Sequence, residues 1–95
     1  MITNNLLIRL KERSNENIEK TRKILLSMEG KIEVLRDIKV EVDINQGEYD
    51  IILFTKFNSV EDLNNYLVHP VHLEIGKYIA SILETQASLC YRSKA

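Results

Sequence analysis

The feature that most constrains the fold is a change of hydrophobic period within a short stretch of chain. Residues 38 to 44 alternate apolar and charged side chains, which is typical of a half-buried strand. Residues 49 to 57 are apolar on both faces, and the turn between the two runs contains Gly47 at a place that suits a hairpin. The pattern therefore predicts an antiparallel pair whose second strand is central in its sheet.

Helical patterns flank this pair on both sides. Ser14 precedes a run with apolar residues at helical spacing, and Gly30 follows where a helix needs a left-handed residue to stop. Ser59 and Asp62 form a capping box that begins a second helix. Pro70 interrupts that helix and opens another segment, because the residue before a proline is pushed out of the helical region. The apolar face expected for this last segment consists of Leu73, Ile75, Ile79, Ile82 and Leu83.

Two further alternating runs, at residues 4 to 11 and 86 to 91, predict the first and last strands. The resulting order, β-α-β-β-α-β, is that of the α+β ferredoxin-like arrangement, in which two helices cover one face of a four-stranded antiparallel sheet. Chains split into domains only well above roughly 200 residues. We therefore expect one domain over residues 1 to 95.

The second face of such a sheet has no helices to cover it. The first and third strands carry apolar residues on both faces, so a single copy would expose a larger apolar patch than monomers usually tolerate. The sequence therefore predicts a homodimer that forms through the open sheet face.

Charge and cysteine content exclude several classes of function. Thirteen basic and fourteen acidic residues give a net charge of -1, which provides no field to hold nucleic acid or anionic lipid. The apolar run at residues 6 to 8 is too short for a signal peptide or a membrane span. Cys90 is the only cysteine, so no intrachain disulfide forms, and we expect a cytoplasmic protein with Cys90 as a small buried apolar residue.

One motif points to a known family. Residues 66 to 72 read Tyr-Leu-Val-His-Pro-Val-His, with paired histidines around a proline after a short helix. Together with residues 9 to 11, residues 57 to 63 and the order of the elements, this motif resembles the stress-responsive α/β-barrel (Dabb) family over the whole chain. The resemblance implies a homodimer whose two sheets stack as a dimeric α/β barrel, with a cavity between sheet and helices in each subunit.

The resemblance also implies roles for individual residues. A plant polyketide cyclase of this family uses a tyrosine and a histidine that match Tyr66 and His72, and a nearby histidine matches His69. The chain departs from that enzyme at Asn4, where the cyclase has a histidine, and at Cys90, where it has an aspartate. The acid expected to orient the catalytic histidine is therefore missing.

The chemistry of these residue types allows two interpretations. His72 has a suitable pKa range to take a proton from carbon next to a carbonyl, and the Tyr66 hydroxyl is suited to stabilise the oxyanion that develops. Alternatively, His72 simply hydrogen-bonds the backbone near the helix break. His69 directly precedes Pro70, a position where a side chain caps the next helix, so a structural role competes with ligand binding there.

No metal site or cofactor is expected. His69 and His72 are spaced to share a helical face, but no third ligand is close in sequence. Gly76 lies inside a predicted helix, where glycine is unfavourable, and either close packing or room for a cavity accounts for it.

Three functions follow as hypotheses. The first is binding of a small apolar or aromatic molecule in a pocket near Tyr66, His69 and His72. The second is an enzyme of the polyketide-cyclase or isomerase type, with His72 as base and Tyr66 as oxyanion donor. The third is a protein whose dimer formation is itself the function. A fully packed interior would favour the third.

Overall fold

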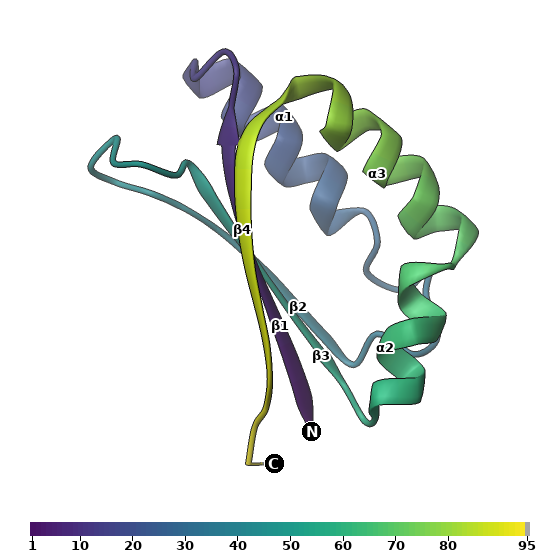
Figure 1. The fold of residues 1–95 in the computed structure, drawn as a ribbon. Helices are drawn as coiled ribbons and strands as arrows, with labels where there is room; N and C mark the ends of the chain where they lie inside the picture. The colour runs from purple at the N-terminus through teal and green to yellow at the C-terminus, as the bar shows by residue number, and fades with distance from the viewer. Residues whose placement is uncertain (95) are drawn as a thin grey trace.

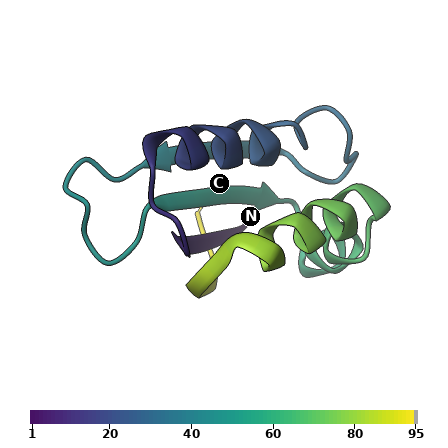
Figure 2. The same cartoon turned by 90° about the horizontal axis from the view of Figure 1, so that it is seen from above.

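The computed structural model describes residues 1 to 94 as a four-stranded antiparallel sheet with all helices on one face (Figure 1). The sheet order is β2-β3-β1-β4, so the predicted ferredoxin-like fold is confirmed, with β3 in a central position. Figure 2 shows α1 and α3 side by side above the sheet. The elements are β1 (Ile2–Leu10), α1 (Asn15–Leu26), β2 (Asp37–Val42), β3 (Ile51–Phe57), α2 (Val60–Leu67), α3 (Pro70–Ile82) and β4 (Leu83–Arg92).

The predicted caps determine where the helices begin. The Ser14 hydroxyl accepts a hydrogen bond from the Asn17 amide, and the Ser59 hydroxyl accepts one from the Asp62 amide. Both serines therefore satisfy a backbone N–H that has no partner inside its helix. Pro70 opens α3, as its fixed φ and missing N–H predict.

The core lies between the sheet and the helices. Alternate residues of the two central strands point toward the helices and are buried, as the period of two requires. This buried set includes Ile2, Ile8, Leu10, Ile51, Leu53 and Phe57 from the sheet, with Leu25 and Ile79 from the helices and Met28 from the turn after α1.

Several element ends differ from the sequence-based expectation. β1 begins at Ile2, and β4 begins at Leu83, which was expected on the apolar face of the last helix. β2 ends at Val42, and Ile44 lies in the hairpin loop with 92% of its surface exposed. The strand ends before Ile44 because the Asp43 carboxylate accepts a hydrogen bond from the Gly47 amide, and this bond begins the turn at residue 43. The first helix ends at Leu26, before a tight turn in which Gly30 adopts the predicted left-handed conformation with φ 79°.

Two predicted buried side chains are exposed. Leu73 is 51% exposed, because it points to the opposite side of α3 from Ile75 and Ile79. Cys90 is also exposed, and its prediction as a buried apolar residue is wrong. It lies on β4, an edge strand in which only Leu83 and Ala87 are half-buried.

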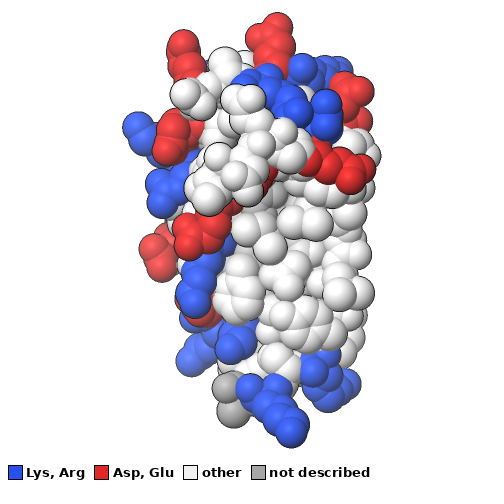
Figure 3. Space-filling view, turned by 90° about the vertical axis from the view of Figure 1, so that its left-hand side faces the viewer, with Lys and Arg blue, Asp and Glu red and all other residues white. Residues whose placement is uncertain are grey.

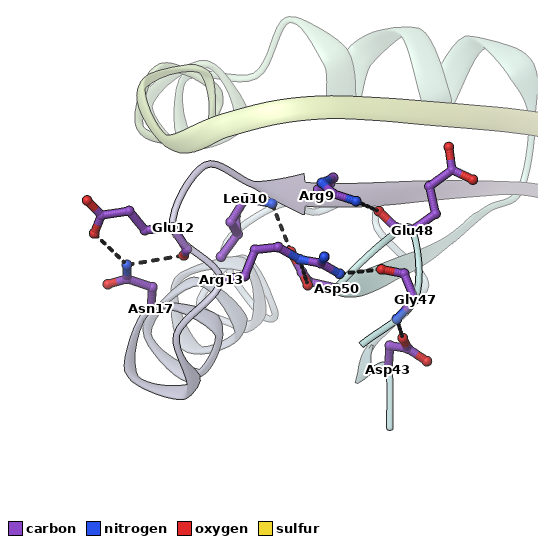
Figure 4. A network of polar contacts seen from close by, with 9 residues as sticks. All are labelled: Arg9, Leu10, Glu12, Arg13, Asn17, Asp43, Gly47, Glu48 and Asp50. Carbon is purple, nitrogen blue, oxygen red and sulfur yellow. Dashed lines mark hydrogen bonds and ion pairs between the residues drawn. The ribbon is translucent and has the colours of Figure 1, made fainter. Parts of the chain in front are cut away.

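A polar network holds the base of the β2–β3 hairpin, and it is called the hairpin network here (Figure 4). The Asp50 carboxylate is buried and accepts from the Leu10 amide and from Arg13 Nε, both at 2.9 Å. Arg13 also donates to the Gly47 carbonyl, and Arg9 donates to the Glu48 carbonyl. The network ties the end of β1 to the hairpin loop.

The open face of the sheet is largely uncharged. Figure 3 looks onto this face, where charged side chains gather at the left-hand margin and at the two ends. The apolar side chains pair across the strands, since Leu7 lies between Ile52 and Ala87, and Asn5 lies between Phe54 and Leu89. In the described part of the chain, no helix has the length and hydropathy needed to span a membrane.

Candidate functional site

A cavity of about 250 Å³ lies between the sheet and α3, and it is called the helix-side cavity here. Its polar side chains are Tyr66, His72 and Gln86, and the remaining lining is apolar or glycine. Those residues are Leu6, Leu25, Met28, Leu53, Ile75, Gly76, Ile79, Ala80 and Leu83. An apolar hollow with a few convergent polar groups is the usual form of a small-molecule site.

Tyr66 is a buried hydrogen-bond donor in this cavity. Its ring packs against Phe57 and His72, with centroids 4.9 Å and 4.5 Å away. The hydroxyl donates to Met28 Sδ at 3.7 Å, and a thioether is a weak acceptor. Burial raises the pKa of Tyr66 to about 12, so the hydroxyl keeps its proton at neutral pH.

His72 has one ring nitrogen fixed and the other free. Nδ1 lies 3.1 Å from the Leu67 carbonyl oxygen, which only accepts, so Nδ1 carries the hydrogen and Nε2 presents a lone pair in the neutral ring. Within residues 1 to 94, no group hydrogen-bonds Nε2. Burial lowers the pKa of His72, the hydrogen bond to Leu67 opposes this shift, and the nearby His69 adds to it, so the pKa lies below its ordinary value. His72 is therefore a neutral base and acceptor near pH 7.

The Leu67 carbonyl orients the His72 ring, which is the role expected of the missing acid. The sequence predicts a backbone hydrogen bond of His72 near the helix break, which Pro70 marks, but it does not identify Leu67 as the partner. A helix break leaves the last carbonyls of the preceding helix without helical partners, and Leu67 is the last residue of α2. The predicted backbone bond of His72 near the break is thus present, and the same bond holds the ring for acid–base chemistry.

His69 does not line the cavity. Its Nδ1 accepts the Val71 amide at 3.1 Å, which confirms the predicted cap of α3. Its Nε2 lies 3.5 Å from a carboxylate oxygen of Glu33. The structure therefore brings Tyr66 and His72 together and assigns His69 to the helix start.

Asn4 and Cys90 are direct cross-strand partners in the β1–β4 pair. They therefore share one sheet face, and neither lines the helix-side cavity. The backbone carbonyl of Asn4 accepts from the Thr55 hydroxyl at 3.2 Å. Asn4 lies two residues from Leu6 on the helix-facing side of the sheet, so the two departures from the cyclase pattern are a single paired change beyond the end of the cavity, while the Tyr66–His72 pair is intact.

Three larger hollows lie elsewhere. One of about 380 Å³ lies beside the hairpin loop, one of about 330 Å³ lies between α1 and α3, and one of about 280 Å³ lies on the open face of the sheet beside Leu7 and Leu89. None of the three contains Tyr66 or His72, so none combines a perturbed acid–base pair with an apolar lining. Residues 1 to 94 contain no group of three or more His, Cys, Asp or Glu side chains placed to hold a metal ion.

The fold and cavity define a class of protein: a ferredoxin-like α+β domain with a pocket on the helix side of its sheet. The particular family follows from the sequence. The sequence model of the stress responsive A/B barrel domain matches residues 2–91, and the chain belongs to that family. Among curated protein sequences, none is significantly similar to this chain.

Solved structures have the same fold. A dimeric Bacteroides fragilis protein of unknown function is 26% identical, with 97% of this chain and 95% of that chain covered and a TM-score of 0.83. An Arabidopsis thaliana protein is 24% identical, with 100% and 97% covered and a TM-score of 0.87. A hydroxynitrile lyase from Passiflora edulis is 18% identical, with 95% and 88% covered and a TM-score of 0.82.

Proposed function

We propose that this protein binds a small apolar or aromatic molecule in the helix-side cavity. The observation that carries the proposal is the pair of unused polar groups on an apolar hollow. Tyr66 offers a hydroxyl whose partner is only a thioether, and His72 offers an Nε2 lone pair. The unbonded Nε2 of His72 is accessible to solvent, because no buried side-chain nitrogen or oxygen of the described residues lacks a partner. A ligand therefore bonds both groups without breaking a strong hydrogen bond of the protein.

The pair favours a ligand that both donates and accepts at one end. A phenol or enol donates its hydrogen to Nε2 of His72 and accepts from the Tyr66 hydroxyl, and both residues line the same cavity with their rings in contact. The body of the ligand then contacts the apolar lining. A charged ligand is disfavoured because the lining contains no cationic or anionic side chain near pH 7.

Binding of 4-methylphenol tests this proposal, because that molecule carries both features. Native mass spectrometry of the purified protein first reports any retained small molecule, and calorimetric titration then measures the affinity for 4-methylphenol. The expected result is binding by the unmodified chain that weakens by about tenfold in Tyr66→Phe, the equivalent of one lost hydrogen bond. Equal affinity in both proteins contradicts the proposed site.

The functional form that we propose is a homodimer closed through the open sheet face. An apolar face that includes Leu7, Ile52 and Phe54 supports it, because a single copy leaves this face in contact with water. The Bacteroides fragilis relative and a Thermobifida fusca relative are both described as dimeric. Sedimentation equilibrium tests the dimer: we expect twice the chain mass for the unmodified protein and a shift to monomer for Ile52→Asp.

We also propose a cytoplasmic location. Cys90 is the only cysteine and is exposed, which fits a compartment that keeps thiols reduced. Fractionation of cells that produce the protein checks this, and recovery with the secreted fraction contradicts it.

A second candidate function is catalysis of cyclisation or isomerisation by proton transfer. The observation in its favour is the Nδ1–H bond to Leu67, which fixes the tautomer that makes Nε2 a base. The Tyr66 hydroxyl keeps its proton at neutral pH and is suited to donate a hydrogen bond to an enolate oxygen. That the Passiflora edulis neighbour is a hydroxynitrile lyase supports this fold as a scaffold for catalysis.

Deuterium exchange separates the two functions. If the protein is an enzyme, it accelerates exchange at the carbon next to the carbonyl of phenylacetone in D2O, and His72→Ala returns the rate to background without loss of Tm. If the protein only binds ligands, the unmodified chain and His72→Ala exchange at the same rate.

A further inference from the structure

Gly76 lies in the middle of α3, which runs from Pro70 to Ile82. Glycine destabilises a helix interior relative to alanine, because it loses the most conformational freedom on folding. A glycine at this place therefore needs a physical reason.

The two usual reasons for glycine do not apply at this position. Gly76 has no left-handed conformation, in contrast to Gly30, whose φ is 79°. Close packing does not require it either, because a Cβ placed on Gly76 meets no atom within 4 Å. Neither backbone strain nor a tight helix-to-sheet contact accounts for the residue.

Gly76 lines the helix-side cavity one helical turn after His72 and one turn before Ala80, which also lines it. The three positions form a row along α3 in which the side chains after His72 are absent or a single methyl group. Gly76 and Ala80 are exposed, so this row forms the end of the cavity that opens to solvent, and it adjoins the space beside the Tyr66–His72 pair.

We propose that Gly76 determines which ligands fit, because the room left by its missing side chain belongs to the binding site. This inference rests on the proposed ligand binding. A ligand whose polar end bonds Tyr66 and His72 extends along α3 across Gly76, so the residue at this position sets the length of the apolar part. The ligand class is a phenol or enol that carries an apolar substituent.

Two phenols and three variants test the proposal. The probes are 4-methylphenol, which is short, and 4-butylphenol, which reaches past the polar pair. We expect Gly76→Leu to weaken 4-butylphenol binding by about tenfold or more and 4-methylphenol by less than about threefold, because the new side chain fills only the outer space. Lys77→Leu is the matched control, since Lys77 is exposed on the same helix outside the lining, and both affinities are expected to stay unchanged.

Gly76→Ala tests the empty space without any ligand. Its Tm is expected to rise, because alanine favours the helix and its methyl group meets no neighbour. A lower Tm in Gly76→Ala overturns the inference and leaves ligand binding intact, as does equal 4-butylphenol affinity in Gly76→Leu and the unmodified chain. If the unmodified chain binds neither phenol, the proposed function fails and this inference fails with it.

Discussion

The hairpin network and the helix-side cavity use their polar groups in opposite ways. In the hairpin network, the Asp50 carboxylate has two protein donors at 2.9 Å, and Arg13 is shared between that carboxylate and a backbone carbonyl. In the cavity, the Tyr66 hydroxyl has only a sulfur acceptor, and Nε2 of His72 has no partner within residues 1 to 94.

This difference indicates that the hairpin network stabilises the fold, whereas the cavity keeps polar groups available for a ligand. A saturated network gains nothing from a ligand and loses much when one member is removed. A pair with spare hydrogen-bonding capacity adds little to folding and is available for a bound molecule. The two regions therefore predict opposite patterns of stability and binding in variants.

Removal of the Asp50 carboxylate is expected to have the largest effect on stability. In Asp50→Ala the Leu10 amide and Arg13 lose their acceptor, so the free energy of unfolding falls by about 3 kcal/mol, as for other broken buried pairs. Urea denaturation measures the change, and the affinity for 4-methylphenol of the remaining folded protein stays unaltered.

Asp50→Asn is the control for this variant. Its amide oxygen still accepts from the Leu10 amide, so the loss is smaller than in Asp50→Ala. If both variants unfold at the same urea concentration as the unmodified chain, the hairpin network does not stabilise the fold. The contrast between this network and the helix-side cavity would then be wrong.

Substitution of His69 is expected to have the next largest effect. His69→Ala removes the side chain that caps α3, which costs about 1 kcal/mol of unfolding free energy. His69→Asn supplies a capping oxygen in place of Nδ1 and is expected to restore most of that loss in thermal unfolding. Phenol affinity is expected to be unchanged in both variants, and a large drop in affinity with normal stability would place His69 in the site instead.

Tyr66→Phe is expected to change stability by less than about 1 kcal/mol, because the hydroxyl bonds only a thioether. Its effect falls on ligand affinity instead. Parallel urea denaturation and phenol titration of this one variant sharpen the comparison. A loss of stability as large as that of Asp50→Ala would show that the Tyr66 hydroxyl belongs to the fold rather than to a site.

The smallest effect is the pH dependence due to His72. Burial lowers the pKa of His72 below its ordinary value of 6.5, so the unfolded chain binds the proton more readily than the folded one. Its contribution to stability is complete above about pH 6.5 and is lost as the pH falls through the folded-state pKa. Urea denaturation between pH 5 and 7.5 is expected to show a shallower slope in His72→Gln, and identical slopes contradict it.

Local signals in the sequence were enough to predict most of the fold. Ser14, Ser59 and Pro70 each act through their own backbone neighbours, so the caps and the helix break were predictable. Ile44 and Cys90 were not, because their exposure depends on where the hairpin closes and on which strand lies at the edge. Those are properties of the assembled sheet.

The candidate site was predictable in its residue types but not in its geometry. The Tyr66–His72 pair was identified from the motif, whereas the Leu67 carbonyl that holds His72 is a backbone group with no side-chain signature. The reason for Gly76 also needed the structure, because a sequence does not distinguish a tight contact from an empty space. Contacts between elements decide both points.

The central claim is that the helix-side cavity binds its ligand through Tyr66 and Nε2 of His72. The most direct measurement is the nitrogen NMR spectrum of the His72 ring during titration with 4-methylphenol. The account predicts a protonated Nδ1 throughout and a free Nε2 whose shift changes on binding, with the change reduced in Tyr66→Phe. Saturation with 4-methylphenol that leaves the Nε2 shift unchanged, or a ring protonated at Nε2 instead of Nδ1, would contradict it.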